Sequence, residues 1–157
     1  MEELSDYTFG RRVYEDAHGI DLMIAPQSTD STEEYELCIV QTEDHCRARF
    51  EVRPSAYSKS RVTIYVYAEG NATVDCVCTL NVPKDVEGIE TDIQIRSWPF
   101  DDARIQARPE MFIKNSNIVA SHGNALGSLN AEQKYYLATK GVSDYKQLIK
   151  ESLLEDA

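Results

Sequence analysis

Cysteine is the residue type in this chain best suited to metal binding, and its spacing argues against a structural metal site. The only close pair is Cys76-x-Cys78, whereas zinc sites usually pair cysteines as C-x₂₋₄-C. In a strand, alternate residues share a face, so both thiols point to the same side. That side also carries the apolar residues Val74, Leu80 and Val82. We therefore predict that this pair lies in the core.

The two remaining cysteines are Cys38 and Cys46. Cys46 shares a face with Phe50 and Val52, and free cysteine is among the most buried residue types. Cys38 shares its parity with Glu36 and Val40, which leaves its side open. Burial keeps a thiol protonated, so Cys46, Cys76 and Cys78 are predicted to be unreactive.

Histidine suits metal ligation and proton transfer, and one of the three histidines has a distinctive setting. His18 and His45 sit among charged residues. His122 lies in a segment from Ser121 to Gly127, in which Gly123 and Gly127 indicate a tight turn at the end of a β region. By itself, a histidine beside a turn is more often structural. Only Cys38 and His122 come into question as metal ligands, and they do not form a recognisable ligand set.

Catalytic signatures are missing from the sequence. It contains no G-x-S-x-G, no H-E-x-x-H and no phosphate-binding loop with its lysine. Carboxylates are abundant but not arranged as a catalytic pair. We therefore predict that the protein is not an enzyme.

The elements that would position these residues are mainly strands. From Ile20 onward, apolar and polar residues alternate in runs that recur every 10–13 residues, with turn residues between them. This predicts a β region over residues 19–120, as a sandwich, a barrel or a β-solenoid. Glu2, Glu3 and Asp6 could begin a short helix before it.

After Gly127 the period becomes helical. Asn130 and Ser143 are predicted N-caps of helices near 130–140 and 143–155, and Gly141 is placed to end the first. These form a helical pair within 128–157. The second helix has an apolar face made of Tyr145, Leu148, Ile149 and Leu153.

Length and charge limit the possible partners. The 157 residues suit one domain. A net charge of −11 disfavours nucleic acid and anionic membrane surfaces as partners. No signal peptide or membrane-spanning run is visible, so we expect a cytoplasmic protein with reduced thiols.

Four short motifs in order resemble the C-terminal signature of the SufB/SufD family of iron–sulfur cluster assembly proteins. They are Pro109-Glu110-Met111-Phe112-Ile113, the stretch Ala120 to Gly127, Leu129-Asn130 through Tyr135-Tyr136-Leu137, and Lys140-Gly141-Val142. The family pattern has Ala-Thr-Val where this chain has Asn124-Ala125-Leu126, and arginine at Lys140. No cysteine lies between Ser97 and Arg108, so the resemblance is nearer the SufD type.

The resemblance implies a right-handed parallel β-helix followed by two C-terminal helices, with an antiparallel β-sandwich as the alternative. It also implies that His122, with the motif turn Ser121, Gly123 and Gly127, lies where two β-helices meet and takes part in cluster assembly. In the family, the C-terminal helices contact a SufC-type ABC ATPase. The corresponding docking candidates here are Tyr135, Tyr136, Leu148 and Ile149.

Two functions remain open at this point. One is a SufD-like scaffold component that associates with a SufC-type ATPase and a SufB-like chain or a second copy of itself. It would hold no cofactor stably, and at most a transient iron–sulfur cluster shared with a partner. The other is a non-catalytic β-solenoid interaction protein that has lost cluster assembly.

Overall fold

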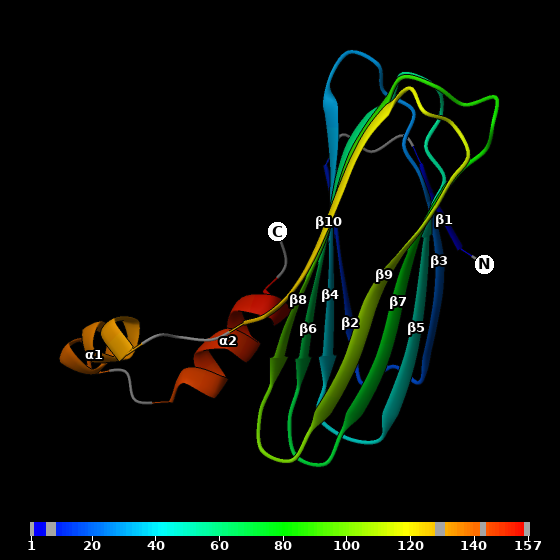
Figure 1. Cartoon of the computed structure of the whole chain (residues 1–157). Coiled ribbons are helices and arrows are strands. Elements are labelled where there is room, and N and C mark those ends of the chain that lie inside the picture. Colours follow the sequence, from blue (N-terminus) through cyan, green and yellow to red (C-terminus); the bar gives the residue numbers. More distant parts are fainter. Residues whose placement is uncertain (1, 6–8, 128–130, 142–143, 156–157) are drawn as a thin grey trace.

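The computed structural model describes residues 2–5, 9–127, 131–141 and 144–155, with side chains from residue 10 onward. Ten strands precede two helices (Figure 1). Their bounds are β1 (Glu2–Ser5), β2 (Phe9–Glu15), β3 (Gly19–Ala25), β4 (Thr32–Gln41), β5 (His45–Val52), β6 (Lys59–Ala68), β7 (Thr73–Val82), β8 (Ile89–Pro99), β9 (Arg104–Ile113), β10 (Ile118–Leu126), α1 (Ala131–Thr139) and α2 (Tyr145–Leu154).

The strands form two parallel sheets that the chain visits alternately. The odd sheet has the order β1-β3-β5-β7-β9, and the even sheet has the order β10-β8-β6-β4-β2. Every strand pair is parallel, and each strand pairs with the next but one along the chain. The result is a β-solenoid of about 4 turns, which confirms the predicted β-helix. An antiparallel sandwich is wrong because hairpins would have paired consecutive strands.

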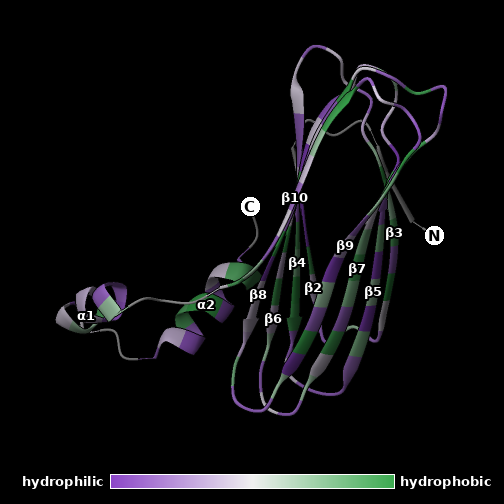
Figure 2. Ribbon diagram, viewed as in Figure 1, coloured by the Kyte–Doolittle hydropathy of each residue, from purple (hydrophilic) through white to green (hydrophobic). Residues whose placement is uncertain are grey.

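The core lies between the two sheets. Residues alternate between buried and more exposed along β3, β5, β7 and β8, because successive side chains point to opposite faces of a strand. Figure 2 shows this alternation as hydrophobic and hydrophilic bands along the strands. Parallel stacking places like residues in line, as with Val62, Ile64 and Val66 beside Ile93, Ile95 and Ser97.

One corner of the solenoid repeats a left-handed backbone conformation. Asp16, Asp44, Gly70 and Asp101 each have φ between 49° and 64°, and each lies between an even strand and the following odd strand. Aspartate and glycine tolerate this region better than other residues. The Asp16 carboxylate accepts a hydrogen bond of 2.7 Å from the Thr42 amide, and Asp101 accepts one of 3.0 Å from Gly70. The turns are thus linked to one another at this corner.

The outer face of the even sheet has a second apolar cluster, which α2 covers. Leu153 is buried there against Cys38, Val40 and Tyr67, and Ile149 packs beside them. Trp98 and Phe100 contact the same cluster. The Trp98-Pro99-Phe100 segment therefore contributes packing under a helix.

Both helices lie close to their predicted ranges. Gly141 has φ +81°, as expected for the residue that ends α1. The N-cap of α2 is Asp144, whose side chain accepts a hydrogen bond from the Gln147 amide. Asn130 and Ser143, the predicted caps, lie outside the described residues.

Strands extend beyond the predicted β region at both ends. β1 and β2 lie where the sequence left a short helix possible. Parallel pairing with β3 and β4 holds these two segments in the extended conformation. β10 runs through Ser121, His122 and Gly123, so the predicted motif turn is wrong. Pairing with β8 over the whole of β10 holds this stretch extended.

Candidate functional site

His122 lies on the last strand of the even sheet. β10 pairs with β8 on one side, and none of the described strands pairs with its other side, so it is an edge strand. β9 is the corresponding edge of the odd sheet. The two strands form the last turn of the solenoid (Figure 1). His122 thus lies at the end of the β core, beside an edge whose backbone groups are free to pair.

The His122 side chain belongs to the row of residues that points between the sheets. His122 is level with Ile93, which is fully buried in the core. Residues level with each other in a parallel sheet point to the same side. His122 is nevertheless exposed, because in the part of the chain that the structure describes no further turn covers the interior at this end. An imidazole would therefore meet whatever covers the open end.

The rest of the open end is largely apolar. Met111 on β9 and Ile118 on β10 pack partly against the core. Ile113 and Leu126 are 37% and 73% exposed. Asn124 is the polar exception, and its Nδ2 donates a 2.6 Å hydrogen bond to the Ala107 carbonyl on β9. This bond connects the two edge strands across the open end.

The glycines beside His122 lie under side chains of β8 and do not form a turn. Gly127 is required by the rigid indole above it, whereas the end of the Gln94 side chain above Gly123 can move. A Cβ at Gly123 would overlap the amide of Gln94, and one at Gly127 would overlap the indole of Trp98. Neither glycine is among those with a positive φ. Ser121 is exposed and donates a 2.7 Å hydrogen bond to Asp92. The motif thus produces a flat strand on which the side chains of β8 can lie.

The four cysteines are all buried. Cys46, Cys76 and Cys78 lie in the core as predicted, and burial raises the pKa of Cys46 to about 11 and that of Cys78 to about 12. Cys38 faces outward under α2, and burial raises its pKa to about 11. Cys38 and His122 do not come together, because β6 and β8 separate their strands. In the described part of the chain, no three histidine, cysteine, aspartate or glutamate side chains are grouped as a metal site would need.

Helix α2 is held to the β core by charged contacts as well as by the Leu153 cluster. Lys150 and Lys146 pair with the Glu69 carboxylate at 2.8 Å and 3.3 Å. Lys146 also pairs with Asp101 at 3.2 Å, and these hydrogen-bonded carboxylates raise the pKa of the lysine. At the other end of α2, Arg11 donates to the Ser152 and Leu153 carbonyls at 3.0 Å and 3.1 Å.

Helix α1, in contrast, projects away from the sheets (Figure 1). It buries none of its described residues. Tyr135 and Tyr136 are 73% and 61% exposed. A 3.0 Å hydrogen bond from the Tyr145 hydroxyl to the Lys134 carbonyl links it to α2. Of the four docking candidates, Tyr135 and Tyr136 therefore lie open, Leu148 is 42% exposed, and Ile149 packs on the β core.

Sequence reasoning missed the residues that anchor α2. The residues concerned are far from the helix in sequence: Arg11, Glu69 and Asp101. From the sequence alone, Glu69 and Asp101 indicate only turns. The apolar face of α2 was visible in its period, but its charged partners had no sequence signal.

Comparison with known proteins agrees with the architecture. Residues 23–147 match the family described as SUF system FeS cluster assembly, SufBD core domain. The chain belongs to the SufBD family. The match begins within β3 and ends within α2, so it includes β4 to β10 and α1.

A relative within the SufBD family is an iron–sulfur cluster assembly SufBD family protein of Synechocystis sp. (strain ATCC 27184 / PCC 6803 / Kazusa). It is 40% identical over 43 residues, which are 27% of this chain and 10% of that protein. The aligned segment thus spans about a tenth of the curated relative. Among the described residues of this SufBD chain, no helix has the length and apolar character that crossing a membrane requires.

Proposed function

We propose that this SufBD chain is a SufD-like component of an iron–sulfur cluster assembly scaffold and acts by protein association. The observation that supports this most is the position of His122 on an uncovered edge strand at the open end of the solenoid. A histidine used only for packing would be covered by its own chain. Here the imidazole is left for a partner to cover.

The partner at this end would be another β-helix, either a SufB-like chain or a second copy. β9 and β10 each present an unpaired backbone edge, and such edges are stable only when they are covered or paired. The exposed apolar side chains between them, including Ile113 and Leu126, would add an apolar contact that excludes water. Pairing strand to strand satisfies both the backbone and the apolar end.

A nascent cluster would be shared cargo and not a resident cofactor. His122 offers one ligand, and the nearby described residues complete no set of three. The four thiols are buried and protonated. The remaining ligands would therefore come from the partner, and binding would be transient.

The proposed docking element for a SufC-type ATPase is α1 together with the exposed start of α2. Tyr135, Tyr136 and Leu148 expose large surfaces there, whereas Ile149 and Leu153 face the core. Tyrosine is enriched among the residues that dominate protein interfaces. In this arrangement α2 connects the ATPase-binding surface to the solenoid through the Leu153 cluster and the Glu69 ion pairs.

The alternative is an interaction protein with the same fold that no longer assembles clusters. The burial of all four cysteines favours it, because no thiolate is available on this chain to accept sulfur or iron. In this alternative, the open end of the solenoid and helix α1 still bind partners, but His122 takes no part in cluster assembly.

Anaerobic reconstitution with iron and sulfide tests the proposal. The chain is mixed with a SufB-like protein and a SufC-type ATPase, and cluster formation is followed by visible absorbance. We expect a complex whose cluster yield falls several-fold with His122→Ala, while far-UV circular dichroism is unchanged. A complex that forms with an undiminished yield in His122→Ala supports the alternative. If the chain binds neither the SufB-like protein nor the ATPase, both the proposed function and the alternative are wrong.

A further inference from the structure

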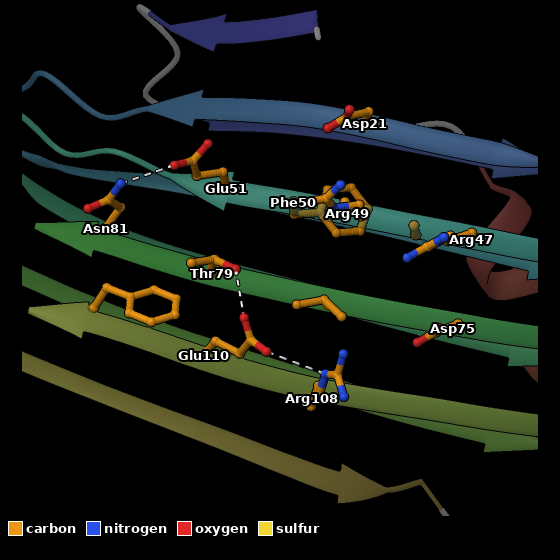
Figure 3. A pocket seen from close by; sticks show the side chains of 13 residues that line it. Asp21, Arg47, Arg49, Phe50, Glu51, Asp75, Thr79, Asn81, Arg108 and Glu110 are labelled. Atoms are coloured by element: carbon orange, nitrogen blue, oxygen red, sulfur yellow. Dashed lines mark hydrogen bonds and ion pairs between the residues drawn. The ribbon is translucent and has the colours of Figure 1, made fainter.

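Neither of the described helices covers the outer face of the odd sheet, and the charge of this face differs from that of the whole chain. Arg47 and Arg49 on β5, Arg53 just after it, and Arg104 and Arg108 on β9 are all exposed on this face. They are five of the nine arginines in a protein of net charge −11. We call these five residues the arginine face. Three of them, Arg47, Arg49 and Arg108, line a hollow of about 440 Å³ over β5, β7 and β9 (Figure 3).

Two carboxylates in this hollow are already held by neighbours. Glu51 accepts 2.8 Å and 3.2 Å hydrogen bonds from Arg53 and Asn81, which lower the pKa of its carboxyl group. Glu110 pairs with Arg108 at 3.5 Å and with Thr79 at 3.4 Å. Figure 3 shows the contact of Glu51 with Asn81 and those of Glu110 with Thr79 and Arg108. Arg53 and Arg108 are thus partly neutralised within the chain.

Arg47, Arg49 and Arg104 differ, because no carboxylate of the described residues lies within 4.0 Å of them. Arg47 and Arg49 are alternate residues of one strand, so their side chains leave the sheet on the same side about 6.6 Å apart. Arg49 is level with Val77, and Val77 is level with Arg108. Arg47 is level with Asp75 on β7 and Arg49 is level with Asp21 on β3, so each arginine lies beside a carboxylate of a neighbouring strand without forming an ion pair with it. These guanidinium groups therefore keep free hydrogen-bond donors for an anion outside the chain.

We propose that the arginine face binds an acidic, extended polypeptide segment of a partner protein. In an extended segment, carboxylates at alternate positions are also about 6.6 Å apart, which matches Arg47 and Arg49. Guanidinium groups bind carboxylates through two parallel hydrogen bonds. The segment would follow β5, with its carboxylates beside Arg47 and Arg49. This site is separate from the open end and from α1, and it does not depend on the function proposed above.

A nucleic acid fits this face less well than an acidic peptide does. A continuous row of phosphates would meet Asp21, Asp75, Glu51 and Glu110, which all line the same hollow. A peptide can place neutral or basic residues opposite these carboxylates. Discrete carboxylates at chosen positions are therefore the matching chemistry.

Fluorescence anisotropy with a labelled twelve-residue peptide of alternating glutamate and serine tests this proposal on the full chain. The test variant is Arg47→Ser/Arg49→Ser. The matched control is Arg61→Ser/Arg96→Ser, which removes the same charge from exposed positions on the even sheet. We expect the test variant to weaken binding about tenfold or more, and the control less than about threefold. A peptide with glutamine in place of glutamate should not bind.

Three results would overturn the proposal. The first is no binding of the glutamate peptide at 0.1 M salt. The second is an equal loss of affinity in the two double variants, which would indicate general attraction. The third is a change of oligomeric state in Arg47→Ser/Arg49→Ser by analytical ultracentrifugation, which would make a second copy of this chain the occupant.

Discussion

The indole of Trp98 on β8 lies against the backbone of Gly127, which follows β10. The Gly127 amide also donates a 2.6 Å hydrogen bond to the Ser97 carbonyl, so the two strands are tied together at this point. Trp98 packs on the apolar cluster that α2 covers. The glycine thus allows the indole to lie between the edge strand β10 and the helix α2.

Gly127→Ala should disturb this contact, because the added methyl group would occupy the space of the indole. We expect a loss of about 1–3 kcal/mol in unfolding free energy, as for other overpacked sites. Trp98 is the only tryptophan, so its fluorescence should change in the folded state. Gly19→Ala is the control, because nothing lies within 4 Å of a Cβ there. Equal effects of the two substitutions would contradict this account of Gly127.

Glu69→Gln should loosen α2 without unfolding the solenoid. It removes the charge that pairs with Lys146 and Lys150, and the side chain of Glu69 is only 15% exposed. We expect a loss of about 1 kcal/mol that shrinks at high salt. Limited proteolysis should cut the C-terminal region faster than in the wild type. Glu34→Gln, which removes a half-exposed pairing with Arg61, is the control and should leave cleavage unchanged.

Leu153→Ala should have a larger effect on the same helix than Glu69→Gln. Leu153 is 7% exposed and packs on Cys38, Val40 and Tyr67. Removing a buried leucine side chain costs about 2–5 kcal/mol when the cavity cannot collapse. A helix can move into the space, so we expect the lower end of this range. The check is labelling of Cys38 with a thiol reagent, which should become faster than that of Cys46.

Stability should fall at alkaline pH because of the buried thiols. Burial raises the pKa of Cys38 and Cys46 to about 11, above the value of about 8.5 in an unfolded chain. The folded state therefore holds these protons longer, and this contribution is complete below about pH 8.5 and lost as pH rises toward 11. Urea unfolding measured from pH 7 to 10 should show the decline.

The double variant Cys46→Ala/Cys78→Ala is the control for this pH dependence. It should be less stable at pH 7 because two buried side chains are shortened. Its stability should then decline less steeply with pH than that of the wild type. A decline as steep as in the wild type would assign the effect to tyrosine or lysine.

Tyr135→Ser/Tyr136→Ser should separate partner binding from folding. Both side chains are mostly exposed, and α1 buries none of its described residues. We expect the unfolding free energy to stay within about 0.5 kcal/mol of the wild type. Co-purification with a SufC-type ATPase should be lost. If the double variant still co-purifies with the ATPase, the docking surface does not lie on α1.

Much of the fold could be predicted because its signals are local. The alternation of Val74, Cys76, Cys78 and Leu80 identified a strand and its buried face. The apolar spacing of α2 identified the face that packs on the sheet. Local alternation alone could not separate a solenoid from a sandwich, because both bury every second residue. The family resemblance supplied the parallel arrangement, which the strand pairing confirms.

The contacts that position the candidate site could be predicted only in part. His122 was identified by residue type and motif, and the prediction that its neighbours form a turn failed. Glycine was interpreted as conformational freedom, whereas Gly127 is needed for the space that the Trp98 indole occupies and Gly123 lies under the movable side chain of Gln94. The partners of those glycines lie about thirty residues earlier, and no local pattern reports such a distance.

The pairing of each strand with the next but one has a consequence for synthesis on the ribosome. Ser60 and Thr91, joined by a 2.9 Å hydrogen bond, are 31 residues apart. When a new strand is synthesised, the strand it pairs with, one turn of the solenoid earlier in the sequence, has already been made. The nascent protein can grow by templated addition, with each finished turn serving as the surface on which the next one orders. The growing edge is always the most recently translated part. Of the described strands, β10, which carries His122, is synthesised last.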